Sequence, residues 1–192
     1  GTQFGLAIHH AYEVDGAFEA VLLVADDLGM MNAGRLTITV DASGAPIGTE
    51  VGKNAPDFAS TTTDGQPFTL SGLRDSVVLL DFWGAWCSPC RASLPHLDAL
   101  ATTYAERGIV IVLMSTDFDP ADSTEFLAAN GFGRFVGLWE PGGKAGNPVA
   151  QLYGVSGPDV GIPRTYLIDR QGVIRYVGHP LELPLELIEA LL

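Results

Sequence analysis

Two cysteines separated by two residues, Cys87 and Cys90, follow directly on a run of apolar residues. The run at 77–82 is almost entirely apolar, which is typical of a central strand covered on both faces. The residues from 88 to about 106 predict a helix, which Gly108 can end. A buried strand that leads into a dithiol at the start of a helix points to an α/β fold.

The cysteine spacing is that of a redox-active pair. Two intervening residues, Ser88 and Pro89, hold the two sulfur atoms within bonding reach when they begin a helix. The free N–H groups and the dipole at a helix N-terminus favour the thiolate form of Cys87, so that Cys87 is the predicted nucleophile. Cys90, one turn into the helix, is predicted to resolve the mixed disulfide.

Two other interpretations of the cysteines carry less weight. A structural zinc site needs four ligands, and the chain has no second cysteine pair. The histidines that would have to complete such a site show no matching ligand spacing; they are His9, His10, His96 and His179. A purely structural disulfide is also disfavoured, because so small a ring restricts the unfolded chain little.

The remaining apolar patterns predict a central mixed sheet with helices on both faces. A hairpin opens at 56–58, turns at Asp64-Gly65 and returns at 67–70. The other predicted elements are a strand at 109–114, helices at 120–130, 148–153 and 184–192, and a hairpin of 165–168 and 173–177.

The first forty residues differ from the rest. Residues 8–40 alternate polar and apolar side chains, which predicts β structure, whereas 42–54 are small, Gly-rich and without an apolar period. A chain of 192 residues exceeds one domain of average size and is too short for two. We therefore predict a β-rich appendage at 1–41, a linker at 42–54 and an α/β domain at 55–192.

Charge and hydropathy exclude two classes of partner. With 10 Lys and Arg against 23 Asp and Glu, the net charge of −13 repels phosphate backbones, so no nucleic acid partner is expected. The longest apolar runs are shorter than the ~20 residues of a membrane helix, so no membrane insertion is expected either. The chain opens on Gly1 instead of Met, from which we expect a longer precursor.

The sequence around the dithiol resembles a known family. The residues at 81–91, DFWGAWCSPCR, with Pro95 after them and GIPRT at 161–165, resemble thioredoxins and, more closely, extracytoplasmic TlpA/ResA-type thiol-disulfide oxidoreductases. The resemblance covers about 48–192. It implies a thioredoxin fold and no cofactor besides the redox-active Cys87–Cys90 disulfide. It also implies disulfide-containing protein substrates, a membrane thiol electron donor of the DsbD type, and a periplasmic or cell-surface location.

The resemblance also assigns two residues beside the cysteines. Pro163 matches the family's cis-proline opposite the disulfide, and only an X-Pro bond adopts cis at low cost; the alternative is an ordinary trans loop proline. Asp81 matches the buried aspartate of thioredoxins. Burial would raise the pKa of its carboxyl group and let it accept a proton from Cys90 through a water. The alternative is a strand-end carboxylate that faces solvent.

A flat apolar patch for the substrate is implied as well. Its residues are Trp86, Pro89, Ile162 and Gly178, although Trp86 taken alone is equally compatible with a core position. Trp83 is expected to pack beneath the patch. Two departures from the family are visible: Ser93 stands where many relatives have a glutamate, and no lysine partner for Asp81 is evident.

The N-terminal residues at 8–41 resemble the C-terminal half of a PKD domain, an immunoglobulin-like β-sandwich of extracellular proteins. This resemblance agrees with an extracytoplasmic location. It also leaves open a non-enzymatic alternative, an extracellular binding or scaffold module that retains a vestigial redox fold.

Two further patterns in the sequence suggest hypotheses. The entry sequence at 55–58, APDF, resembles that of peroxiredoxins, but the peroxidatic Pro-x-x-x-Thr-x-x-Cys site is missing, so a peroxidase is an alternative. Asp117, Asp119 and Asp122 lack the ligand spacing of an EF-hand. We predict that these three residues form a helix cap and a solvated face.

Overall fold

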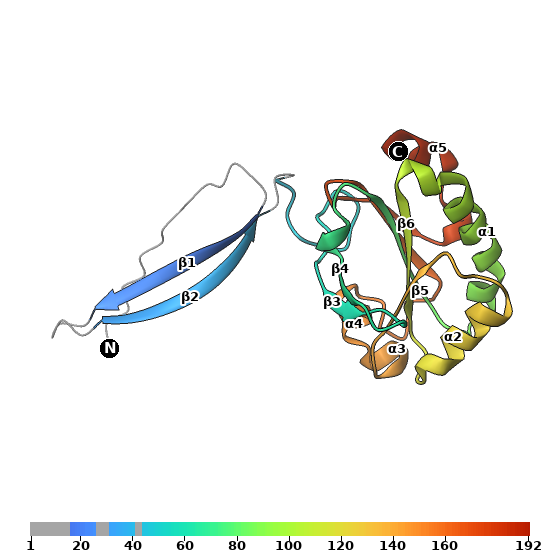
Figure 1. The fold of residues 1–192 in the computed structure, drawn as a ribbon, viewed down its shortest axis with the longest axis horizontal. Coiled ribbons are helices and arrows are strands. Elements are labelled where there is room, and N and C mark those ends of the chain that lie inside the picture. The colour runs from blue at the N-terminus through green and yellow to red at the C-terminus, as the bar shows by residue number, and fades with distance from the viewer. Residues whose placement is uncertain (1–15, 26–30, 41–43) are drawn as a thin grey trace. The chain divides into compact units, whose positions relative to one another are not determined.

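The computed structural model describes residues 16–25, 31–40 and 44–192, and the chain divides into two units, Gly1–Gly44 and Ala45–Leu192 (Figure 1). In the first unit, β1 (Gly16–Ala25) and β2 (Met31–Val40) form an antiparallel pair with Gly16 opposite Val40. The β structure predicted for this region is therefore present where it is described. Residues 26–30 lie outside the described residues, as do His9 and His10 and other parts of the PKD-like stretch.

The second unit is built on a five-stranded mixed sheet in the order β7-β6-β5-β8-β9. The central strand β5 (Val77–Trp83) runs parallel to β6 (Ile109–Ser115) and antiparallel to β8 (Arg164–Ile168). The outer strands are β7 (Val136–Trp139), parallel to β6, and β9 (Ile174–Gly178), antiparallel to β8. This arrangement confirms the predicted thioredoxin fold.

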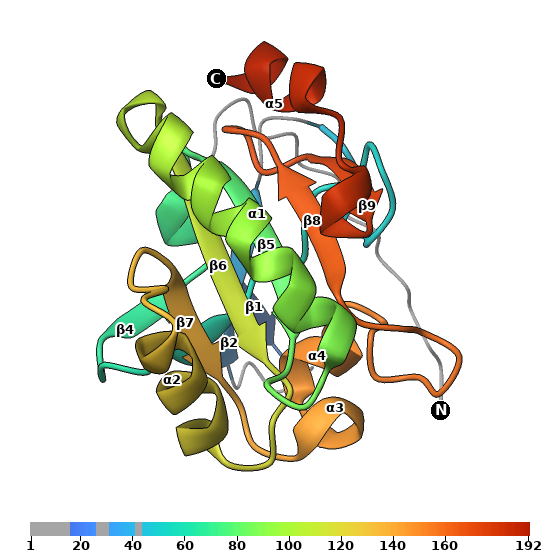
Figure 2. The ribbon, with the colours of Figure 1, turned by 90° about the vertical axis from the view of Figure 1, so that its right-hand side faces the viewer.

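Helices and a small hairpin cover the two faces of this sheet (Figure 1). One face carries α1 (Ser88–Tyr104), α2 (Pro120–Ala129) and α5 (Leu185–Leu191), and Figure 2 shows α1 running over β5 between β6 and β8. The other face carries the hairpin of β3 (Ala59–Thr61) and β4 (Pro67–Thr69), with α3 (Gly143–Gly146) and α4 (Pro148–Leu152). Short 3-10 turns lie at Ser71–Leu73, Ala105–Arg107 and Pro180–Glu182.

Alternation along β5 supplies both halves of the core. All seven of its residues are buried, which confirms the prediction of a central strand. Leu79 and Trp83 pack with Leu94 and Leu97 of α1, whereas Leu80 and Phe82 join the cluster on the opposite face. Successive side chains of a strand point to opposite faces, so Asp81 shares the face of Leu79 and Trp83.

Strand β7 and helix α3 were not predicted. The four residues of β7 lie at the edge of the sheet, and only Leu138 among them is fully buried. A short, half-covered edge strand has neither the length nor the apolar run by which β5 and β6 are recognised.

Residues 45–54 are attached to the second unit, although their composition predicted a linker. The amide of Gly52 donates to the carbonyl of Ile174, and the amide of Ile174 donates to the carbonyl of Lys53, both at 2.8 Å. Main-chain hydrogen bonds place no demand on side-chain type. The small, Gly-rich sequence therefore carries no sign of this attachment.

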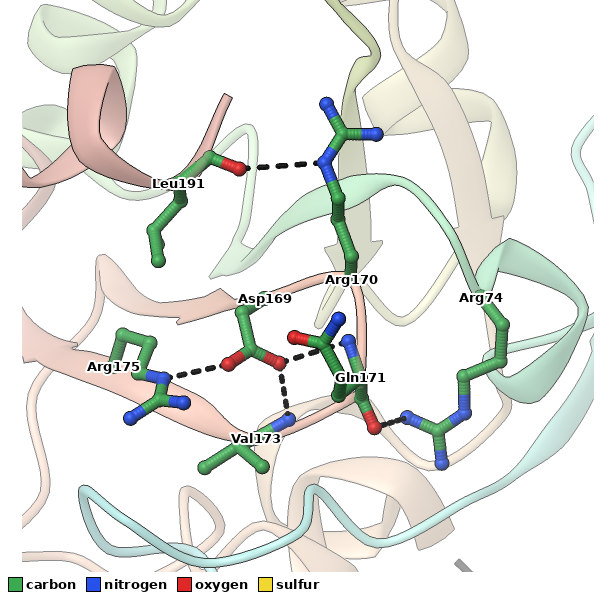
Figure 3. A network of polar contacts seen from close by, with 7 residues as sticks. All are labelled: Arg74, Asp169, Arg170, Gln171, Val173, Arg175 and Leu191. Atoms are coloured by element: carbon green, nitrogen blue, oxygen red, sulfur yellow. Dashed lines mark hydrogen bonds and ion pairs between the residues drawn. The ribbon is translucent and has the colours of Figure 1, made fainter. Parts of the chain in front are cut away.

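The turn between β8 and β9 is organised by one buried carboxylate (Figure 3). Asp169 Oδ1 accepts hydrogen bonds from the amides of Gln171 and Val173, at 3.0 and 2.9 Å, while Oδ2 pairs with Arg175 Nε at 2.6 Å. Three charge-assisted contacts on one carboxylate fix the hairpin that the sequence predicted here.

Next to that turn, one guanidinium group joins three segments of the chain. Arg170 donates to the carbonyl of Asp75 at 2.6 Å, to that of Arg107 at 3.1 Å and to that of Leu191 at 3.3 Å. It also reaches a main-chain oxygen of Leu192 at 3.1 Å. The starts of β5 and β6 and the end of α5 are therefore held at one point.

Candidate active site

The two cysteines lie at the start of α1 and are joined by a disulfide. Cys87 is the N-cap residue, and its sulfur accepts a hydrogen bond from the amide of Cys90 at 3.2 Å. Pro89 occupies the first turn, where its missing N–H costs the helix nothing. Cys87 thus stands at the helix N-terminus, where a thiolate is stabilised.

The surroundings distinguish the two sulfur atoms. Cys90 is completely buried, whereas Cys87 retains 4% of its surface. The carbonyl oxygen of Ile162 lies 3.5 Å from Cys87 Sγ, and the Ile162–Pro163 peptide bond is cis. The loop before β8 is therefore in contact with the more accessible cysteine.

Asp81 lies in the middle of the sheet, on the face that also carries Cys90 and α1. It is fully buried, so the alternative of a carboxylate that faces solvent is wrong. The hydroxyl of Thr165 donates to Asp81 Oδ1 at 2.5 Å, while Oδ2 has no hydrogen-bond partner among the described residues. Burial raises the pKa of this carboxyl group to about 7, and the Thr165 hydrogen bond partly opposes that rise.

No sequence pattern had assigned a role to Thr165. Asp81 pairs across the sheet with Leu113 on one side and with Thr165 on the other, so a hydroxyl is the polar neighbour that the strand register provides. Thr165 belongs to the GIPRT segment that marked the Pro163 loop. Its contact with Asp81 depends on the antiparallel register of β5 and β8, which no local pattern reveals.

The residues predicted for the substrate patch differ in their exposure. Trp86 is 59% exposed, so the interpretation of Trp86 as a core residue is wrong, and Pro89 is exposed beside it. Ile162 is half-buried. Gly178 pairs with Thr165 at the same end of the sheet.

Trp83, which was expected to pack beneath the patch, is buried, and its ring centroid lies 6.1 Å from that of Phe126. Ser93 is also buried, and its hydroxyl donates to the carbonyl of Cys90 at 2.8 Å. Position 93, where the family resemblance leads one to expect a glutamate, is therefore occupied by a group that completes its hydrogen bond within α1.

A second buried carboxylate supports the loop before the cysteines. Asp117 accepts the amide of Ala85 at 3.0 Å and the hydroxyl of Ser115 at 2.8 Å. The predicted solvated face is therefore wrong for Asp117, because the Ala85 loop covers it. The predicted helix cap is confirmed at Asp119, which accepts the amide of Ala121 at 2.9 Å.

The described residues show no cluster of three or more metal-ligating side chains. No helix in the described part of the chain is long and apolar enough to cross a bilayer.

A thioredoxin fold with a dithiol at the N-terminus of α1 defines the class of thioredoxin-like thiol-disulfide oxidoreductases. Residues 51–177 match the model of the AhpC/TSA family. The chain belongs to this family. The match contains both cysteines and Asp81, and it begins after β1 and β2.

Curated relatives agree with this class. The chain is 34% identical to thiol-disulfide oxidoreductase ResA of Bacillus thuringiensis (strain Al Hakam), over 65% of this chain and 67% of the relative. It is 33% identical to ResA of Geobacillus kaustophilus, over 66% of this chain and 68% of the relative. The chain is accordingly a ResA-type thiol-disulfide oxidoreductase, and its Cys87–Cys90 pair fits dithiol-disulfide exchange.

Solved structures give the same result. A Chlorobium tepidum protein described as a candidate thiol:disulfide interchange protein DsbE superposes with a TM-score of 0.63 and 34% identity, covering 74% of this chain and 98% of that one. A candidate protein disulfide isomerase from Bacteroides thetaiotaomicron gives a TM-score of 0.62 at 28% identity. The superposition covers 74% of this chain and 86% of that one.

Proposed function

We propose that the protein reduces disulfides in extracytoplasmic proteins by dithiol-disulfide exchange. The observation that carries this proposal is the buried Asp81 carboxyl group, on the sheet face that holds Cys90, with one oxygen free of hydrogen bonds among the described residues and a pKa of about 7. Such a group can accept a proton near neutral pH. Completing a reduction requires that Cys90 lose its proton.

In the first step, the Cys87 thiolate attacks one sulfur of the substrate disulfide. A bond forms between that sulfur and Cys87, the substrate disulfide breaks, and its other sulfur leaves as a thiolate that takes a proton from solvent. The helix N-terminus favours the attacking thiolate. Trp86, Pro89, Ile162 and Gly178 are the proposed contacts of the substrate segment.

In the second step, Asp81 accepts the proton of Cys90 through a water. The Cys90 thiolate attacks Cys87, the Cys87–Cys90 disulfide forms, and the second substrate sulfur leaves as a thiolate. Two electrons have then passed from the protein to the substrate. Pro163 is the proposed support for the substrate segment opposite Cys87.

A new cycle requires a source of electrons. We propose a membrane thiol carrier of the DsbD type, because the protein is expected in the periplasm or on the cell surface. The PKD-like pattern of the N-terminal strands is compatible with that location. The ResA and DsbE names of the relatives support the same setting.

The reduction potential of the Cys87–Cys90 pair tests the direction of electron flow. Equilibration with dithiothreitol and glutathione buffers should give a value near about −270 mV, as for thioredoxin, whereas a value near about −120 mV would identify an oxidant of folding proteins. The Cys87→Ser variant should lose all exchange with protein disulfides, and if it retained exchange the scaffold alternative would stand.

The peroxidase alternative is tested separately. Reduced protein mixed with hydrogen peroxide or an alkyl hydroperoxide should consume the peroxide no faster than the Cys87→Ser variant does. Rapid consumption that depends on Cys87 would replace disulfide reduction by peroxide reduction as the main activity.

A further inference from the structure

We infer that Phe118, together with Trp86, forms a docking surface for an apolar side chain that lies beside the substrate's cysteine. This inference rests on the proposed disulfide reduction and names a feature of its substrates. Phe118 is 82% exposed, the largest exposed fraction among the large apolar side chains of residues 44–192, and Trp86 is 59% exposed. No motif had singled out Phe118.

The loop that carries Phe118 is fixed on both sides. Asp117, before it, is buried and bonded to Ala85 and Ser115. Asp119, after it, caps α2, whose first residue is Pro120. An aromatic side chain displayed by a fixed loop loses little conformational entropy when it binds a partner.

Hydrogen bonds between the neighbouring residues join the two loops that carry the aromatic side chains. Ala85 precedes Trp86 and Asp117 precedes Phe118, and the amide of Ala85 donates to both carboxylate oxygens of Asp117, at 3.0 and 3.1 Å. The two loops follow β5 and β6, which are parallel neighbours and so end at the same edge of the sheet. Phe118 therefore lies on the loop next to the one that leads to Cys87.

Both rings rest on a glycine. A methyl group added at Gly143 would come within 2.8 Å of the Phe118 ring, and one added at Gly84 would come within 2.6 Å of the Trp86 indole. Each glycine leaves room for the ring to lie against the main chain. The rings are thereby supported from below while their outer surfaces remain exposed.

The occupant of this surface follows from the access to Cys87. Cys87 exposes only 4% of its surface, so the substrate chain must lie against the residues around it for the sulfur atoms to meet. Two exposed aromatic side chains, one on the loop that leads to Cys87 and one on the neighbouring loop, favour a polypeptide with a large apolar residue next to its cysteine. Such residues are accessible in unfolded chains and exposed loops.

Two synthetic peptides test the inference. Both contain one intramolecular disulfide and differ only in the residue beside the attacked cysteine, which is leucine in one and serine in the other. The reduced full chain should show a higher kcat/KM for the leucine peptide. The ratio of the two kcat/KM values, leucine peptide over serine peptide, should fall about tenfold in Phe118→Ser, because truncating an important contact residue can weaken binding by about this factor.

Ile47→Ser is the matched control, because Ile47 is 74% exposed and lies in the segment attached to β9. In this variant the ratio of the two kcat/KM values should equal that of the unchanged protein. An unchanged ratio in Phe118→Ser would overturn the inference. If the unchanged protein reduced neither peptide, the proposed function itself would fail, and the two failures are therefore distinguishable.

A trapping experiment covers the case in which Phe118→Ser does not fold. Cys90→Ser should retain a mixed disulfide between Cys87 and a peptide that carries a photo-crosslinking residue in place of the leucine. The crosslinks located by mass spectrometry should fall on 117–119 and on Trp86. Crosslinks confined to other segments would contradict the proposed surface.

Discussion

Thr165 donates a hydrogen bond to one oxygen of Asp81 and leaves the other oxygen without a partner among the described residues. A carboxyl group that is buried but only half satisfied favours its neutral form, because ionisation in a place without solvent is costly. The pair therefore connects the stability of the fold with the proton transfer proposed for Cys90.

Asp81→Asn should slow the resolution of the mixed disulfide and leave the first attack by Cys87 nearly unchanged, because asparagine cannot accept the Cys90 proton. Stopped-flow measurements of the two steps provide the test. In the unchanged protein the resolution rate should fall as the pH drops below about 7, and this dependence should be absent in the variant. Equal slowing of both steps would contradict the role of Asp81.

The same carboxyl group should make stability depend on pH. The pKa of Asp81 is raised from 3.8 to about 7, so between these values the folded chain holds a proton that the unfolded chain has lost. Stability should therefore fall as the pH rises from about 4 to 7, and then level off. Over this pH range the free energy of unfolding should decrease by roughly 4 kcal/mol.

Urea unfolding of the oxidised protein measures this effect, with Asp81→Asn as the reference because it lacks the titrating group. The difference in unfolding free energy, variant minus unchanged protein, should grow between pH 4 and pH 8. A constant difference would show that the Asp81 carboxyl group titrates at an ordinary pKa.

Asp117→Ala should destabilise the fold and disturb the loop before the cysteines. It removes the acceptor of the Ala85 amide and of the buried Ser115 hydroxyl, and an unsatisfied polar group costs about 1–3 kcal/mol. Asp117→Asn keeps one acceptor oxygen and should lose less. Urea unfolding of both variants gives the order of their unfolding free energies. An equal loss of unfolding free energy would show that the volume of the Asp117 side chain matters more than its hydrogen bonds.

Arg170→Ala should lower the free energy of unfolding by about 2–3 kcal/mol, because it removes a charged donor shared by several main-chain oxygens. Arg134→Ala is the control, since Arg134 is exposed and makes no ion pair with any described residue. Thermal unfolding followed by circular dichroism compares the two. A similar effect in both variants would point to net charge as the cause.

The sequence was sufficient for the parts of the fold whose signals are local. The apolar run of β5 and the cysteine spacing predicted the centre of the sheet and the start of α1, and Gly108 follows the last turn after α1 with a φ of 89°. These features depend on burial of one strand and on the backbone freedom of one glycine.

Features that depend on contacts between distant residues could not be predicted in the same way. Asp117 lies two residues before the cap of α2, which suggested a solvated face, yet its burial comes from Ala85 in another loop. The contact of Thr165 with Asp81 likewise follows from the strand register. Strand β7 was missed because an edge strand of four residues needs little apolar sequence.

The hydrogen bonds at the two edges of the sheet affect whether an unfolded chain could add to the sheet as an extra strand. Lys53 and Gly52 pair with Ile174 of β9, and the amide of Thr63 donates to the carbonyl of Gly137 in β7. An unpaired sheet edge is a template on which foreign strands add and aggregate. By occupying part of both outer strands with its own chain, the protein discourages such addition, and the proposed place for an extended substrate is the Ile162 loop, whose carbonyl oxygen contacts Cys87.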